Sequence, residues 1–204
     1  MTETPFRQAS AAGDRGAAML ELMLLLPFLL LLAFGGAELG VAWVTDNRVE
    51  GAVAQAARIG ASSGGRVEAD RDILVALRAG LPAGELARLD RVVVYLPIDA
   101  AGTVPPGCIK SAGDPTDGGL AGCNSYSGAT VRGISATSMT GFGGTVGKWD
   151  AFWPPASRRD ALLDPPDHIG VWVRTTHVGI TGLAFDEITV VESTVFRIQP
   201  DLSG

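Results

Sequence analysis

The pattern of hydrophobic and polar residues is dominated by one apolar segment near the N-terminus. Residues 22–37 carry no charge, Glu38 follows, and residues 39–44 are again uncharged. A helix needs about 20 residues to cross a hydrocarbon core of about 30 Å. The segment is therefore long enough to span a bilayer, provided that Glu38 lies near an interface or finds a partner.

Three interpretations of this segment compete. Residues 24–32 are apolar on every face, whereas a helix at the edge of a small soluble domain shows one apolar stripe, so a soluble helix is the weakest of the three. A cleaved signal peptide fits Gly35 and Ala37, which are small residues at the −3 and −1 positions for cleavage after Ala37. The chain stays apolar through residues 39–44, however, where a mature secreted protein would turn polar. We therefore favour a retained transmembrane helix over residues 17–45.

Helical periodicity continues beyond this segment. Apolar residues recur at helical spacing over residues 46–61, and the Ser-Ser-Gly-Gly sequence of residues 62–65 then stops the helix. A second amphipathic helix is predicted over residues 68–79, with one further turn at residues 84–89. Residues 46–90 are thus expected to form a helical region that follows the membrane.

The remaining chain, residues 91–204, is predicted to be rich in β-structure. Residues 92–98, 169–177 and 188–198 are β-branched or aromatic runs bounded by turn signals, so each is predicted to be a strand. The Gly-, Ser- and Thr-rich region 102–147 has no sustained period and is expected to be a long, partly irregular excursion. Pairing of the three strands gives a small antiparallel sheet that the amphipathic helices cover, and hence an α+β fold.

The N-terminal sequence resembles a known family. Residues 15–22 (RGAAMLEL), continued by Leu26-Pro27 and by residues 36–40 (GAELG), are similar to the N-terminus of TadE-like proteins, the minor pseudopilins of the tight-adherence (Flp-type) pilus system. A looser similarity to the family's C-terminal strand lies at residues 192–200. The resemblance implies a membrane protein that works with other pilin-like subunits.

The resemblance also implies proteolytic processing. In the family, a short cytoplasmic leader ends in glycine, a prepilin peptidase cuts after this glycine, and glutamate occupies the fifth mature position. Applied to this chain, residues 1–16 are the leader, the cut falls between Gly16 and Ala17, and Glu21 is the fifth mature residue.

Elementary electrostatics fits this role for Glu21. A carboxylate near the start of an apolar helix costs a few kcal/mol to bury, so it needs a named partner. Cleavage would leave a positive amine on Ala17, and Glu21, one helical turn later, would neutralise an amine on its own or a neighbouring helix. The alternative is that Glu21 lies hydrated in the headgroup layer. Gly36 and Gly40 form a GxxxG spacing that would allow two helices to approach closely, although chance matches to this motif are common.

The two cysteines indicate which side of the membrane holds the C-terminal domain. Cys108 and Cys123 are too few for a structural zinc site, which needs four ligands, and His168 and His177 do not complete one convincingly. We favour a disulfide, with two free thiols as the alternative. A disulfide persists in an oxidising compartment, which places the β-rich domain outside the cytoplasm and the N-terminus inside. The arginine count does not decide the orientation, because two arginines precede the apolar segment and two follow it closely.

No signature of catalysis accompanies these features. The sequence has no nucleophile elbow, no phosphate-binding glycine loop before a helix and no His-Glu metal helix, so no catalytic residue, metal or cofactor is predicted. The net charge of −6 and the lack of a basic patch argue against a nucleic-acid partner.

The sequence as a whole predicts a minor pilin-like subunit in the bacterial inner membrane. Its expected partners are other pilin-like subunits, the prepilin peptidase, the pilus assembly platform and the lipid bilayer. The alternative is a secreted or signal-anchored enzyme or binding domain whose apolar segment is an ordinary export signal.

Overall fold

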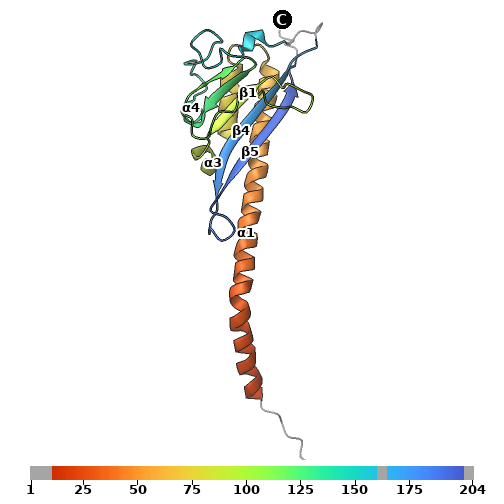
Figure 1. Ribbon diagram of the computed structural model, residues 1–204, viewed down its shortest axis with the longest axis vertical. Helices are drawn as coiled ribbons and strands as arrows, with labels where there is room; N and C mark the ends of the chain where they lie inside the picture. Colours follow the sequence, from red (N-terminus) through yellow and green to blue (C-terminus); the bar gives the residue numbers. More distant parts are fainter. Residues whose placement is uncertain (1–10, 160–164, 200–204) are drawn as a thin grey trace, which may run out of the picture.

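The computed structural model describes residues 11–159 and 165–199 (Figure 1). One long helix forms a stalk, and its C-terminal half lies against a head made of a sheet, short helices and loops. In chain order the elements are α1 (Ala11–Ser63), α2 (Ala69–Gly80), α3 (Ala83–Ala87), β1 (Arg91–Tyr95), β2 (Gly118–Leu120), β3 (Cys123–Ser127), α4 (Gly128–Gly133), the 3-10 turn η1 (Pro155–Ser157), β4 (His168–Val178) and β5 (Glu187–Arg197).

The head contains a five-stranded sheet in the order β2-β3-β1-β4-β5, and every neighbouring pair is antiparallel. The central strand β1 places Val93 opposite Ser125 of β3 on one side and opposite Trp172 of β4 on the other. The α+β class, the antiparallel sheet and the N-terminal apolar helix are as the sequence predicts. The three predicted strands correspond to β1, β4 and β5, although β1 ends at Tyr95, before the predicted end of that strand at Ile98.

Residues 102–147, expected to be partly irregular, contain three short elements that the sequence analysis did not name: β2, β3 and α4. Strand β2 is three residues long and begins with two glycines, so it has no readable period. Strand β3 has the sequence Cys-Asn-Ser-Tyr-Ser, and all five residues are buried. A polar strand can be buried only when tertiary partners satisfy its side chains, and a hydrophobicity pattern cannot reveal such partners.

Strand β1 is buried on both faces, and its successive side chains point to opposite faces of the sheet. Val92 and Val94 belong to the main core, which the helices α1 and α2 cover, with Val53 and Leu74 among their contributions. On the opposite face, a second cluster lies under the loop that follows β1; it consists of Val93, Tyr95, Cys108, Cys123 and Trp172. The stalk helix therefore continues directly into the main core of the head.

A buried polar network ties α2 to the sheet. The Asp70 carboxylate, fully buried, accepts hydrogen bonds from Asn124 Nδ2 at 2.7 Å and from the Tyr126 hydroxyl at 2.6 Å, and it pairs with the guanidinium of Arg158. Arg158 also lies over the ring of Trp153, at 4.3 Å from its centroid. Burial and the neighbouring Asp70 charge raise the pKa of Tyr126, so its hydroxyl keeps the proton that it donates.

The network generates the first prediction. We expect Asp70→Asn to lower the free energy of unfolding by about 3–5 kcal/mol, because the variant leaves the buried Arg158 cation without a counter-charge. Chemical unfolding of the full chain in detergent, followed by near-ultraviolet circular dichroism, measures the loss. The matched control is Asp72→Asn on the same helix, whose carboxylate is partly exposed and pairs with Arg71. Equal losses in the two variants would contradict this account.

Candidate functional site

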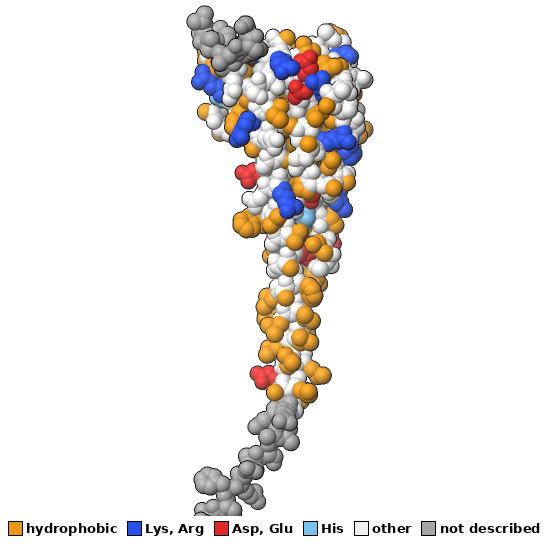
Figure 2. All heavy atoms as spheres, turned by 180° about the vertical axis from the view of Figure 1, so that it is seen from behind, with side chains coloured by type: hydrophobic (Ala, Val, Ile, Leu, Met, Phe, Trp, Pro, Cys, Tyr) orange, Lys and Arg blue, Asp and Glu red, His pale blue; other side chains and the backbone are white. Residues whose placement is uncertain are grey.

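Residues 16–34 of α1 are exposed around the whole circumference of the helix. Large apolar side chains from Met19 to Phe34 project into solvent, and Figure 2 shows them gathered along the narrow part of the molecule. Among the described residues, α1 is the one helix long and apolar enough to cross a membrane, and none of its most apolar window is buried. Helices that are hydrophobic all round occur in buried positions or in membranes, and nothing in the head covers this one.

The residues assigned to processing and assembly lie on this exposed half. Gly16, Ala17 and Glu21 are all exposed on α1, and the last two are one helical turn apart. Gly36 and Gly40 also face open space, because a Cβ atom at either position would meet nothing within 4 Å. The surface around these glycines is therefore free for a close-packed partner, while the roles of all five residues stay predictions.

Glu38 is the functional residue whose partner the sequence could not name. Its side chain is only 2% exposed, and its carboxylate accepts four hydrogen bonds from the loop between β4 and β5. Oε1 accepts from the backbone N–H of Thr181 at 2.9 Å and of Gly182 at 3.0 Å. Oε2 accepts from Thr181 Oγ1 and from the backbone N–H of Ala184, both at 2.9 Å. We call this set of contacts the Glu38 clasp.

The loop has the shape that the Glu38 clasp requires. Gly179 starts the turn, and a Cβ atom there would lie 2.5 Å from Glu38 Oε1 and 2.2 Å from the Phe185 carbonyl oxygen. Gly182 has a φ of +68°, in the left-handed region that glycine adopts without strain. The turn signals that the sequence analysis noted between the two strands therefore build a carboxylate-binding loop.

Glu38 is also the first residue of the face by which α1 meets the head. Buried positions follow it at helical spacing, at Ala42, Thr45, Val49 and Val53. Residues 16–37 of α1 are exposed or, at Gly35, half-buried. The change of environment along the helix therefore falls at Glu38.

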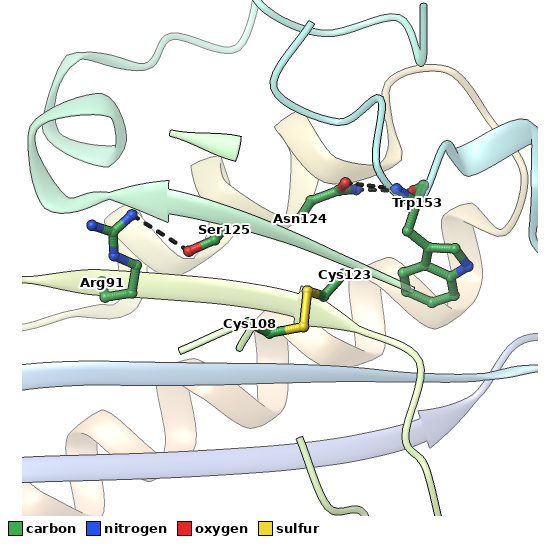
Figure 3. The surroundings of a disulfide bond; sticks show 6 residues. All are labelled: Arg91, Cys108, Cys123, Asn124, Ser125 and Trp153. Atoms are coloured by element: carbon green, nitrogen blue, oxygen red, sulfur yellow. Dashed lines mark hydrogen bonds between the residues drawn. A yellow bond between two sulfur atoms is a disulfide. The ribbon is translucent and has the colours of Figure 1, made fainter. Parts of the chain in front are cut away.

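The predicted disulfide is present between Cys108 and Cys123, with a Cα–Cα distance of 6.1 Å (Figure 3). Both residues are buried, and the bond fixes the loop after β1 to the first residue of β3. Next to it, Asn124 exchanges two hydrogen bonds with the backbone of Trp153, each 2.9 Å long. A disulfide that closes a loop of this length is worth about 3 kcal/mol on the chain-entropy model.

Three acidic side chains come together where α1 crosses β5, the strand at one edge of the sheet. Glu192 of β5 faces Asp46 and Glu50 of α1, and partial burial together with these two like charges raises the pKa of Glu192. In the described part of the chain, no group of three or more His, Cys, Asp or Glu side chains is arranged to hold a metal ion. The buried pair of His177 and Glu85, 2.9 Å apart, connects β4 to α3.

The geometry defines the class of the protein. An exposed apolar helix near the N-terminus that runs into an α+β head indicates a single-pass membrane protein. Residues 16–58 match the family model described as TadE-like protein, which confirms the resemblance for this segment. The weaker similarity at residues 192–200 lies outside the match and stays a prediction, and Pro200 lies outside the described residues. Comparison of the chain with curated proteins and with solved structures found no match.

The Glu38 clasp generates a prediction about local stability. In Glu38→Gln, an NH2 group replaces one acceptor oxygen, so at least one backbone N–H of the loop loses its partner. We expect the amides of Thr181, Gly182 and Ala184 to exchange with deuterium about tenfold faster, while those of β1 stay unchanged. Hydrogen–deuterium exchange of the full chain in detergent measures this. The control is Glu187→Gln, an exposed residue at the same end of the hairpin. Unchanged exchange in the Glu38 variant would contradict the assignment.

The acidic contact of Glu192 predicts a pH dependence. A carboxyl whose pKa is raised in the folded state favours folding when it is protonated. The stabilisation of the folded state is complete below the ordinary pKa of a glutamate and is lost as the pH rises through the raised pKa of Glu192. We therefore expect Glu192→Gln to be more stable than the native chain at neutral pH, with the difference vanishing in acid. Unfolding midpoints from pH 3 to 8 test this, with Glu187→Gln as the control on the same strand. A stability difference between the variant and the native chain that grew at acid pH would contradict a raised pKa for Glu192.

Proposed function

We propose that this protein is a minor pilin-like subunit of a tight-adherence pilus, acting through helix–helix assembly contacts and not through catalysis. The observation that carries the proposal is the fully exposed apolar half of α1, whose sequence matches the TadE-like family. In this proposal the helix crosses the bacterial inner membrane, with the N-terminus in the cytoplasm. The Cys108–Cys123 disulfide supports a head in an oxidising compartment outside it.

Processing prepares the helix for assembly. A prepilin peptidase removes residues 1–16, and Ala17 then carries a positive amine at the edge of the membrane. Glu21 lies one turn further along α1, where its exposed carboxylate is available to an amine of its own helix or of a neighbour. Because a lone carboxylate is costly at this depth, pairing with a neighbour would favour the assembled state over the dispersed monomer.

The glycines of the same helix support close packing. Gly36 and Gly40 lie one turn apart and face open space, so the backbone of a second pilin-like helix could approach there without a clash. The proposed partners are therefore other pilin-like subunits and the assembly platform in the membrane, with the lipid bilayer around the remaining apolar surface.

The prediction concerns the start of the mature chain and the role of Glu21. N-terminal mass spectrometry of protein extracted from membranes should give a chain that begins at Ala17. Glu21→Gln should keep the head folded, because Glu21 is far from it along α1, yet reduce surface pili to background, since the neutral side chain cannot pair with the amine. Electron microscopy of the cells counts the pili.

The control is Glu50→Gln, the same change on the head-bearing half of α1, which should leave pili unchanged. If Glu21→Gln left both processing and pilus number unchanged, its proposed role would be wrong. A mature chain that began near Glu38 would instead support the alternative of a secreted enzyme or binding domain with an ordinary export signal. An intact leader would mean an unprocessed anchor.

A further inference from the structure

The loop between β4 and β5, residues 179–186, hangs from the head beside α1 (Figure 1). The Glu38 clasp holds it against the helix at the point where the exposed apolar half ends. Two large apolar side chains at its tip point outward: Ile180 is 70% exposed and Leu183 is 57% exposed. No charged residue occurs between Gly179 and Phe185.

The position of the Glu38 clasp along α1 sets the height of this loop relative to the bilayer. At about 1.5 Å per residue, the helix rises about 27 Å between Met19 and Ala37, close to the hydrocarbon thickness of about 30 Å. A bilayer centred on this stretch therefore ends next to Glu38. Because the loop is hydrogen-bonded to Glu38, it lies at the outer face of the same bilayer. This step rests on α1 spanning the membrane and not on any role in a pilus.

The backbone of the loop is prepared for an environment of low polarity. The N–H groups of Thr181, Gly182 and Ala184 donate to Glu38, that of Leu183 donates to Thr181 Oγ1, and that of Gly179 donates to the Asp186 carbonyl. Unpaired amides would cost several kcal/mol each in lipid, so the pairing of these five lowers the penalty for entering the interface. The Glu38 carboxylate is in turn surrounded by four donors.

The surface of α1 at the level of the loop is also apolar. Leu39 and Trp43 are both exposed on the turns that follow Ala37. Tryptophan is enriched where a membrane meets water, because its ring has an apolar body and a polar N–H group. The loop tip and these two residues thus continue the exposed apolar surface of the stalk to just beyond the Glu38 clasp.

We propose that the β4–β5 loop is a second membrane contact, in which Ile180 and Leu183 enter the interfacial layer of the bilayer that α1 crosses. Two contacts fix the orientation of a rigid body more strongly than one, so the head is held at a set height and tilt above the lipid. The Glu38 clasp maintains this arrangement, because it prevents the loop from moving away from the helix.

Spin-label accessibility tests the contact directly. The full chain is purified without reductant, so that Cys108 and Cys123 stay oxidised and only an introduced cysteine reacts. Leu183→Cys carries a nitroxide, and the protein is reconstituted in vesicles of phosphatidylethanolamine and phosphatidylglycerol. Oxygen concentrates in lipid and a nickel chelate stays in water, so we expect the label to collide several-fold more with oxygen than with nickel. The control is Val146→Cys, a fully exposed apolar position in the loop between α4 and η1, where nickel should dominate.

Each outcome decides the proposal. A label at position 183 that meets nickel as readily as the label at position 146 would overturn it. Dipolar broadening that grows with the protein-to-lipid ratio would show a second copy of the chain on the loop, and would also overturn it. In the supporting case, adding Glu38→Gln should raise nickel access at position 183, because the released loop leaves the interface. None of these readouts depends on pilus formation, so a failure of the proposed function leaves this test intact.

Discussion

The Glu38 carboxylate lies where α1 changes from a helix that is apolar on every side to one that packs a single face against the head. On one side of it, α1 presents apolar side chains in every direction, an arrangement suited to lipid. On the other side, the same helix presents a single buried face to a sheet. A charged residue at this junction would be costly in lipid and is unpaired in the helix itself, so four donors from the β4–β5 loop satisfy it. This contact fixes where the β4–β5 loop meets α1, and the buried face that follows it on the helix holds the rest of the head.

The head depends on buried polar groups as much as on its hydrophobic core. Asp70, Asn124 and Arg158 connect a helix, a strand and a loop, and the disulfide closes the other face of the sheet. These contacts cost a desolvation penalty that only well-matched partners offset, and they make the packing of the irregular segments specific.

The exposed features divide by height along the molecule. Gly16, Ala17 and Glu21 lie at the base of the stalk, and Gly36 and Gly40 flank Glu38 at the level of the clasp. The loop tip with Ile180 and Leu183 lies at the junction with the head. These exposed features are therefore grouped at the two ends of the apolar half of α1.

The sequence by itself determined whatever local periodicity and composition encode. The all-round apolar run predicted the exposed half of α1, β-branched runs predicted β1, β4 and β5, and the isolated cysteine pair predicted the disulfide. The strand β3 escaped prediction because its polar residues are buried by partners distant in the sequence. The partner of Glu38 was equally hidden, since Thr181 is 143 residues away and its backbone N–H has no sequence signature. Only the tertiary structure could decide these points, because hydrogen bonds between distant segments depend on where the whole fold places them.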